Sequence, residues 1–104
     1  MARLIWTEPA LRDLDDIAEY IALDDPLAAS RYVQKVFDRV ERLESHPQSG
    51  KRPPELPRSP YRELVVPPCR IFYRVEQTTV YVLHVMRSER LLRSYLLNQR
   101  NREK

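Results

Sequence analysis

The alternation of apolar and polar side chains is strongest between residues 61 and 92. Residues 70–76 alternate with a period of two, and residues 79–87 are almost continuously apolar. The first pattern is typical of a strand with one buried face, and the second is typical of a strand buried on both faces. Together with the run that begins at Tyr61, these segments predict three consecutive antiparallel strands.

A turn formed by Gln77 and Thr78 would set the register of the last two strands. The predicted cross-strand pairs are Glu76 with Thr79, Arg74 with Tyr81, Phe72 with Leu83, and Arg70 with Val85. Arg87 then lies on the same face as Arg70, roughly 7–8 Å away at Cα, where both guanidinium groups could reach one phosphate. The opposite face is apolar and is expected to pack against helices. It carries Ile71, Tyr73 and Val75 against His84, Val82 and Val80.

The length of that turn leaves a second register open. A loop with an odd number of residues would shift the pairing by one position and turn Arg70 toward His84. No Asn-Gly or Asp-Gly pair occurs in the segment to specify a two-residue turn. The sequence therefore favours the first register without excluding the second.

The first half of the chain predicts a strand followed by a helix. Residues 3–6 form the short strand, and Thr7 is placed to cap a helix whose first turn holds Glu8 and Pro9. Apolar residues then recur at helical spacing with acidic residues between them. They are Leu11, Leu14, Ile17, Ala18 and Ile21.

The segment Asp24-Asp25-Pro26 predicts the end of this helix and the start of another, because aspartate caps helices and proline fits their first position. One apolar seam runs along roughly five turns of the second helix. Its members are Ala29, Val33, Val36, Val40 and Leu43. We expect an antiparallel helical hairpin whose seam faces the core or a partner.

A long loop and a short last helix complete the predicted elements. The stretch from Ser45 to Pro60 contains five prolines and shows no periodicity, which predicts an extended loop that is functional or mobile. After the strands, a short C-terminal helix is expected to carry one apolar face. Its members are Leu91, Leu92, Tyr95 and Leu96. Beyond Asn98 the chain is polar, and residues 97–104 are expected to fray.

Length and composition fit one small domain. The 104 residues fit a single domain, 1–104, and a hydrophobic content of 42% suffices for a modest core. The predicted fold is α+β, with an N-terminal strand, a helical hairpin packed on a small, mainly antiparallel sheet of about four strands, and a short C-terminal helix. The single cysteine, Cys69, cannot form an internal disulfide, and no run is long enough to span a membrane. These features predict a cytoplasmic protein with no membrane association.

Positive charge is concentrated in the second half of the chain. Residues 1–45 hold 6 basic and 10 acidic side chains, a balance of −4, and residues 46–104 hold 12 basic and 5 acidic side chains, a balance of +7. Such a distribution favours an anionic partner, either nucleic acid or an acidic protein surface. A solvated basic face would have the same composition, so charge alone leaves both interpretations open.

Arginine is the residue type that carries the candidate chemistry. The sequence has no glycine-rich phosphate loop, no metal-ligand spacing and no nucleophile–base pair, so neither a cofactor nor a metal is expected. Guanidinium groups bind phosphates through paired hydrogen bonds and stabilise charge on a phosphoryl group without a metal. The arginines around the predicted sheet are Arg62, Arg70, Arg74, Arg87, Arg90 and Arg93.

Four motifs follow one another along the chain. They are HP-x-x-G-K from His46, YRELVV from Tyr61, R-x-x-YRV from Arg70, and VLHVMRSERLL from Val82. With the helix sequence ALRDLDDIAEYI, they resemble the RelE/ParE superfamily of toxins from bacterial type II toxin–antitoxin systems. The resemblance covers nearly the whole chain, and the DLDDI helix and the HP-x-x-G-K loop are closer to the ParE branch.

The resemblance implies one of two targets. RelE-like toxins cleave messenger RNA on the ribosome with arginines of the sheet and a tyrosine or histidine close after the last arginine. The matching residues are Arg70, Arg87 and Arg62, with Tyr95 as the first tyrosine after Arg87, farther along than the pattern has it. ParE-like toxins inhibit DNA gyrase as protein ligands and need no catalytic residues. The corresponding binding surface would be Arg74, Arg87, Arg90 and Arg93.

The displaced tyrosine favours the gyrase inhibitor, because metal-free RNA cleavage depends on proton transfer. A metal-independent mRNA endonuclease that acts on ribosomes is the alternative. Without the resemblance, a small basic nucleic-acid-binding domain would also fit the composition.

An antitoxin is the other partner that the resemblance implies. It would be a short, acidic, partly disordered protein that folds on the toxin and forms a hetero-oligomer with it. The candidate contacts are Leu91, Leu92, Tyr95 and Leu96. The same apolar face could instead cover the chain's own sheet, and the sequence does not choose between these roles.

Overall fold

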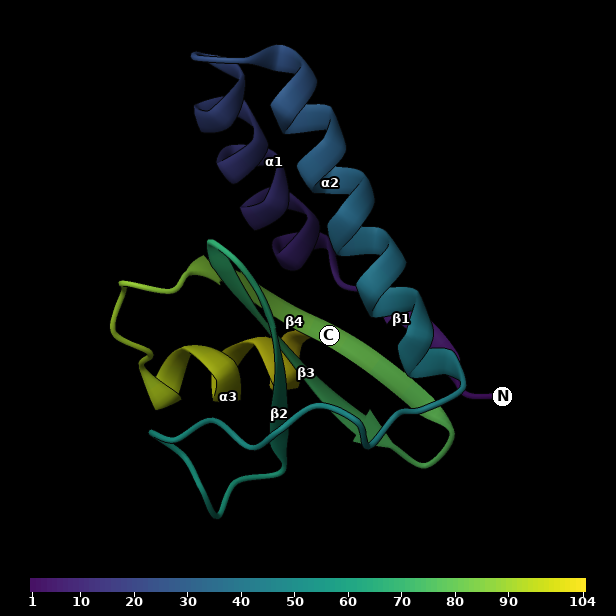
Figure 1. Ribbon diagram of the computed structural model, residues 1–104. Coiled ribbons are helices and arrows are strands. Elements are labelled where there is room, and N and C mark those ends of the chain that lie inside the picture. The colour runs from purple at the N-terminus through teal and green to yellow at the C-terminus, as the bar shows by residue number, and fades with distance from the viewer.

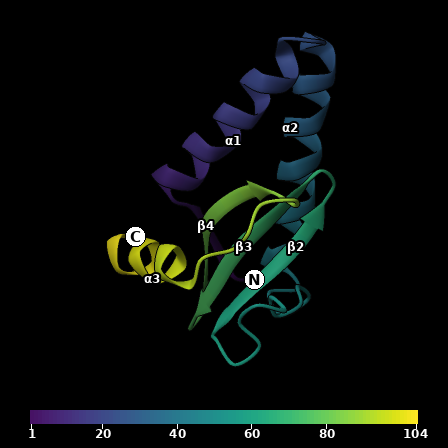
Figure 2. The ribbon, with the colours of Figure 1, turned by 90° about the vertical axis from the view of Figure 1, so that its left-hand side faces the viewer.

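The computed structural model describes residues 1–104 and has the α+β architecture expected from the sequence. The elements in chain order are β1 (Arg3–Trp6), α1 (Glu8–Ala22), α2 (Pro26–Glu41), the 3-10 turn η1 (Arg42–Glu44), β2 (Tyr61–Val66), β3 (Cys69–Glu76), β4 (Thr79–Arg87) and α3 (Ser94–Glu103). The strand order is β1-β4-β3-β2, with β1 parallel to β4 and the other neighbours antiparallel. The hairpin of α1 and α2 packs on one face of the sheet and extends beyond it, and α3 packs on the other face (Figures 1 and 2).

Both helices of the hairpin begin at the predicted caps. The Thr7 hydroxyl accepts a hydrogen bond from the Ala10 amide at 3.4 Å, and the Asp25 carboxylate accepts from the amides of Leu27 at 3.1 Å and Ala28 at 3.2 Å. These amides lie in the first turn, where a helix offers no carbonyl partner. The caps therefore fix where α1 and α2 start, and through them the reach of the hairpin over the sheet.

Apolar side chains form a separate cluster on each face of the sheet. The hairpin side takes up the predicted seam of α2, where Val36, Val40 and Leu43 are fully buried and Val33 is partly buried. The other side is smaller and lies under α3. Its members are Tyr61, Phe72, Leu83, Met86, Leu92 and Leu97.

The expected fraying of residues 97–104 is wrong, because α3 continues to Glu103. Leu97 is fully buried against the sheet. At the end of the chain, the Lys104 ammonium lies 2.7 Å from the Glu76 carboxylate. One buried leucine in an otherwise polar segment therefore holds the last helix in place.

The pairing of β3 with β4 follows the predicted register near the turn and departs from it farther along. The predicted pairs of Glu76 with Thr79 and of Arg74 with Tyr81 are confirmed. An irregularity then places Phe72 opposite His84 and Arg70 opposite Met86, so the predicted partners Leu83 and Val85 are wrong. A β-bulge adds one residue to one strand and shifts every later pair by one position.

This shift separates Arg70 from Arg87. Arg87 pairs with Cys69, whose side chain belongs to the hairpin-side cluster, whereas Arg70 pairs with Met86 in the cluster under α3. Successive side chains of a strand point to opposite faces, so the two arginines lie on opposite sides of the sheet. The expectation that they share one phosphate is therefore wrong.

Candidate functional site

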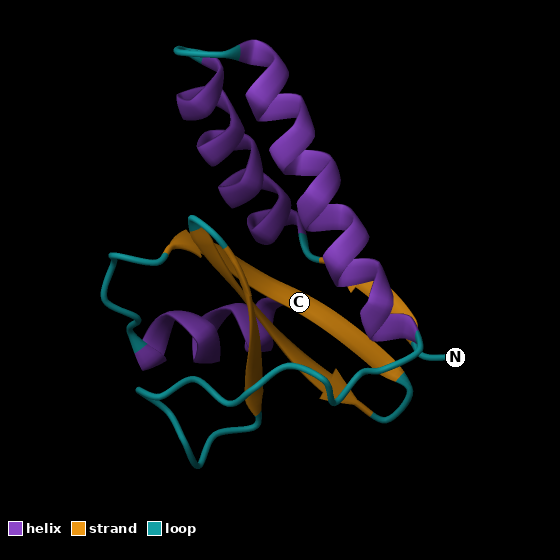
Figure 3. Ribbon diagram, in the orientation of Figure 1, coloured by secondary structure: helices purple, strands orange, loops and turns teal.

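The long loop between η1 and β2, one of the teal segments in Figure 3, is held by polar contacts along its course. The Gly50 amide donates to the Tyr73 hydroxyl at 2.9 Å, and that hydroxyl donates to the Pro47 carbonyl at 2.9 Å. The Arg62 guanidinium donates to the carbonyls of Gly50 at 2.8 Å and Gln48 at 3.2 Å. The HP-x-x-G-K motif is thus a structural clamp, and Arg62 is engaged in it.

Arg70 is held by two carboxylates. Its Nε and Nη2 donate to Glu63 at 3.1 and 2.6 Å, and its Nη1 and Nη2 donate to Glu55 at 2.8 and 2.7 Å. Arg70 is 9% exposed and Glu63 is 2% exposed. The hydrogen bonds from Arg70 lower the pKa of Glu55 to about 2. All three guanidinium nitrogens are engaged, so an incoming phosphate would have to displace a carboxylate.

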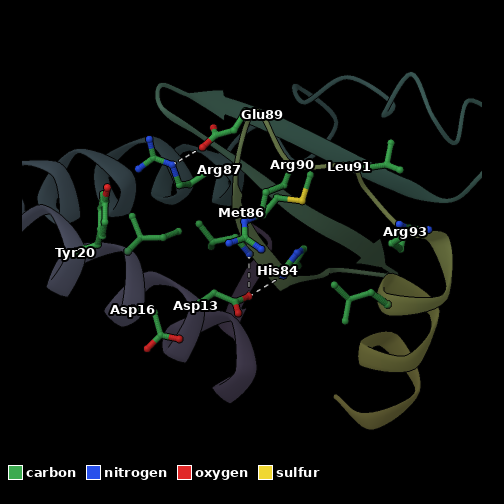
Figure 4. Close-up of a pocket in the computed structure, with 13 residues that line it drawn as sticks. Asp13, Asp16, Tyr20, His84, Met86, Arg87, Glu89, Arg90, Leu91 and Arg93 are labelled. Carbon is green, nitrogen blue, oxygen red and sulfur yellow. Dashed lines mark hydrogen bonds and ion pairs between the residues drawn. The ribbon is translucent and has the colours of Figure 1, made fainter.

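A cleft of about 670 Å³ opens beside the end of β4, between α1 and the segment that leads to α3 (Figure 4). It brings together part of the predicted site. The candidate binding residues from the sequence analysis that line it are Arg87, Arg90, Leu91, Arg93 and Leu96. Apolar and cationic side chains therefore share one concave surface.

The three arginines of the cleft differ in how they are engaged. Arg87 Nε donates to Glu89 at 2.6 Å, and its guanidinium carbon lies 5.6 Å from the centroid of the Tyr20 ring. Arg90 and Arg93 are exposed, and neither forms an ion pair. Their charges are available to a partner, unlike that of Arg70.

The floor of the cleft holds a polar cluster that the sequence did not indicate. The Asp13 carboxylate lies 2.7 Å from His84 Nδ1 and is paired with the Arg100 guanidinium. Burial alone would raise the pKa of Asp13, but the hydrogen bonds from His84 and Arg100 outweigh it and hold that pKa below its ordinary value of 3.8. The cluster joins α1, β4 and α3, the three elements that form the cleft.

His84 was expected on the hairpin face, opposite Ile71, and this is wrong. The bulge turns it to the other face, where its ring stacks on Phe72 with centroids 5.8 Å apart and an interplanar angle of 17°. His84 and Asp13 are 71 residues apart in the sequence, so no local pattern could have paired them.

The remaining predicted residues lie outside the cleft. Arg74 lies on the face under α3, opposite Tyr61 and Tyr81, and Tyr95 is 67% exposed on α3. The apolar face predicted near the C-terminus is divided between two roles. Leu92 is buried in the cluster under α3, whereas Leu91 is 65% exposed and lines the cleft.

Two further properties limit what the structure can hold. No three His, Cys, Asp or Glu side chains are grouped in a way that could bind a metal ion. None of the helices combines the length and the apolar character that crossing a bilayer requires.

Comparisons with known proteins agree with the motifs and the fold. Residues 4–92 match the family model described as ParE toxin of type II toxin-antitoxin system, parDE. The chain is 36% identical over 92 residues to Toxin RelE2 of Caulobacter vibrioides, which covers 88% of this chain and 100% of that protein. It is 43% identical over 86 residues to Putative toxin Y4kP of Sinorhizobium fredii, which covers 81% of this chain and 85% of that protein.

Two solved structures have a similar fold. A chain of the chromosomal ParDE TA system from P. aeruginosa matches with a TM-score of 0.72 and 32% identity, over 86% of this chain and 98% of that chain. A chain of the toxin-antitoxin complex RelBE2 from Mycobacterium tuberculosis matches with a TM-score of 0.51 and 20% identity, over 83% and 96% of the two chains, and this likeness is one of fold alone. The family match, the two curated relatives and the ParDE structure together show that this chain belongs to the ParE toxin family of type II toxin–antitoxin systems, within the RelE/ParE superfamily.

Proposed function

We propose that this toxin arrests growth in the cytoplasm by binding DNA gyrase through the arginine-lined cleft, without cleaving RNA. The observation that carries the proposal is the engagement of Arg70. Its guanidinium is held by Glu55 and Glu63 on the face of the sheet opposite Arg87. Arg70 and Arg87 were expected to hold one scissile phosphate together, and they lie on opposite faces of the sheet.

The positions of the other expected catalytic residues support the same conclusion. Metal-free attack by a 2′-hydroxyl needs a cation and a proton donor or acceptor within reach of one phosphate. Arg62 is engaged with the loop around Gly50, and Tyr95 does not line the cleft. The four residues expected to cleave RNA therefore do not form one site. They are Arg62, Arg70, Arg87 and Tyr95.

The cleft has the properties of a protein-binding surface. Arg90 and Arg93 carry charges without ion-pair partners beside the apolar side chains of Leu91 and Leu96. Arginine beside apolar side chains is typical of the centre of protein interfaces, where a few such residues contribute most of the binding free energy. The ParE resemblance implies gyrase as the partner, and an acidic surface on it would complement these arginines.

We also infer an antitoxin partner. The similar ParDE and RelBE2 chains come from toxin–antitoxin systems, and the basic half of this chain, with a balance of +7 over residues 46–104, favours an acidic partner. The resulting hetero-oligomer would suppress toxicity by covering the surface that binds the target.

The target is tested with the purified toxin in two parallel assays. One measures supercoiling by gyrase, and the other maps transcript ends in translating ribosomes. We expect inhibited supercoiling with intact transcripts, and a weaker effect for R90A/R93A. Arg58→Ala in the loop is the matched control that leaves inhibition unchanged. Codon-phased cuts with unaffected gyrase would overturn the proposal.

An mRNA endonuclease is the second candidate, and His84 is the observation that favours it. Its ring lines the same cleft as Arg87 and is oriented by Asp13, which is the arrangement of a general base. In this case cuts would appear in the ribosome assay and would be lost in His84→Ala. Intact transcripts with the unmodified toxin exclude this candidate.

A further inference from the structure

One flank of α2 carries a row of cations at helical spacing. The row runs along α2 and ends at the first residue of η1, and its members are Arg31, Lys35, Arg39 and Arg42. By helix geometry the four residues fall within an arc of about 80° around the axis, and the row is about 16 Å long. Residues three and four positions apart are neighbours on a helix surface, so the charges form one continuous stripe.

The cations of this α2 row have no acidic partner within the protein. Three of them are exposed and Arg39 is partly exposed, and none forms an ion pair. A carboxylate is within helical reach, because Asp38 lies three positions after Lys35 and four before Arg42. It instead accepts a hydrogen bond from the Gln34 side chain at 2.9 Å. The row therefore keeps its charge although a neutralising group is close by.

The α2 row lies apart from the arginine-lined cleft. None of its members lines that cleft, which opens between α1, the end of β4 and the segment before α3. Figure 2 shows α2 above β2, whereas α3 lies beside β4. Next to the row on the helix surface, the Tyr32 hydroxyl donates to the Val66 carbonyl of β2 at 2.6 Å. The chain therefore has two basic surfaces, and they are built on different elements.

The spacing and the surroundings of the α2 row fit the backbone of a duplex. Phosphates of one DNA strand follow one another at about 3.4 Å along the axis, so a row of about 16 Å spans about five of them. Arginine and lysine both bind phosphates, and such contacts do not depend on base sequence. A single strand would need exposed aromatic rings on which bases stack. The ring beside the row, Tyr32, is 9% exposed and bonds inward, so a duplex fits better.

We propose that the α2 row binds the phosphate backbone of duplex DNA, namely the DNA that gyrase holds. The proposal rests on gyrase as the target proposed above. The cleft then contacts the enzyme, and the row adds a second contact to the DNA. Two contacts on one assembly reinforce each other, so the toxin binds gyrase that holds DNA more tightly than gyrase alone.

The first measurement titrates the purified toxin into a fluorescently labelled DNA duplex at several salt concentrations. Each phosphate neutralised adds about 0.9 to the slope of log K against log salt concentration. The row variant removes all four cations and is R31Q/K35Q/R39Q/R42Q. Its slope should be smaller by about 3–4, and its affinity at about 0.15 M salt should be at least about tenfold lower.

A matched variant removes the same net charge from exposed positions that are dispersed over the surface. It is R3Q/R12Q/R58Q/R102Q. Its DNA affinity should stay within about threefold of the unmodified toxin, since dispersed charges beyond a Debye length are largely screened. Exposed glutamine is tolerated in helices, and a thermal melt checks that both variants fold. K35Q/R39Q replaces the fourfold row variant if the latter unfolds, with about half the change in slope expected.

The second measurement compares toxin binding to immobilised gyrase with and without a bound DNA duplex. We expect the unmodified toxin to bind at least about tenfold more tightly when DNA is present. The row variant should lose this gain and keep its affinity for gyrase alone, whereas R90A/R93A should bind more weakly in both conditions. Binding to gyrase without any gain from DNA would overturn the DNA contact alone. No binding to gyrase in either condition would overturn the proposed target, and the titration with free DNA would still decide whether the row binds a duplex.

Three further outcomes would overturn the DNA contact. Equal losses of DNA affinity in the row variant and in the dispersed variant would show that net charge alone explains the binding. Tighter binding to duplex RNA of the same sequence would favour an RNA partner. Unchanged DNA affinity in the row variant, together with weaker binding to gyrase alone, would assign the row to an acidic surface of the enzyme.

Discussion

Arg70 and Arg87 lie close together along the sheet, yet the two regions around them are opposite in character. Arg70 is 9% exposed and meets two carboxylates, one of them on Glu63 at 2% exposure. Arg87 lines an open cleft beside two arginines without ion-pair partners. In the first region the charge of Arg70 is paired inside the protein. In the second region the cleft keeps arginines that have no ion-pair partner.

The difference teaches that carboxylate neighbours decide what an arginine does. Desolvating a charge costs several kcal/mol unless paired groups offset it, so a buried arginine brings its own acidic partners. Glu63 reaches Arg70 from β2, and Glu55 reaches it from the loop. Residue type and predicted spacing suggested one phosphate site shared by Arg70 and Arg87. The contacts instead engage Arg70 with two carboxylates, on the face of the sheet opposite Arg87.

The largest expected effect on stability comes from removing the guanidinium of Arg70, which is paired with two carboxylates. In Arg70→Ala, Glu63 would stay buried without a charge partner, which costs about 3–5 kcal/mol of the free energy of unfolding. Urea unfolding at neutral pH measures it. A loss below about 1 kcal/mol would show that Arg70 contributes no more to the fold than a surface arginine. It would contradict the difference between Arg70 and the arginines of the cleft.

A smaller loss is expected where the loop meets the sheet. A Cβ at residue 50 would lie 2.5 Å from the Tyr73 hydroxyl and 2.7 Å from the Glu63 carbonyl, so Gly50→Ala forces the clamp to move. We expect a loss of about 1–3 kcal/mol, since overpacking a closed site has costs of this size. Thermal unfolding tests this, with Ser49→Ala as the neighbouring control. An unchanged melting temperature would mean that the loop is not clamped.

The parts of the fold that the sequence predicted are those with local causes. Thr7 and Asp25 cap helices through residues two or three positions away, and the seam of α2 repeats within single turns. The hairpin turn at Gln77 was also predicted, since the pairing of Glu76 with Thr79 depends on four consecutive residues.

The rest depends on contacts between distant segments. The bulge opposite Phe72 has no signature in the run Val80–Met86, and it alone moves Arg87 and His84 to unexpected faces. The pairing of Asp13 with Arg100 spans 87 residues, and it fixes a helix that looked frayed. The sequence could therefore indicate arginines as candidate site residues, while their grouping could not be predicted from spacing.

The pH dependence of Glu55 sharpens the comparison further. Its pKa is about 2 in the folded protein and ordinarily 4.5, so its contribution is complete above about pH 4.5 and is lost as pH falls toward 2. The Glu55 side chain is 29% exposed, and solvent screening limits the contribution to about 0.5–1 kcal/mol. Unfolding of Glu55→Gln and the unmodified protein at pH 7 and pH 2.5 should show a difference that shrinks at the lower pH. A constant difference would contradict a charge-based role.

The smallest effect on stability, and the most informative about function, is expected for Arg90. Its guanidinium is exposed and has no ion-pair partner, so Arg90→Ala should change the free energy of unfolding by less than about 0.5 kcal/mol. Growth arrest should nevertheless weaken in a graded way, because an interface loses part of its electrostatic complementarity when one charge is removed. Measuring stability and toxicity on the same variant separates the two regions: Arg70→Ala should lose toxicity together with stability, and Arg90→Ala should lose toxicity alone. Full toxicity in Arg90→Ala would remove this arginine from the target surface and leave Arg87 and Arg93 as the candidates.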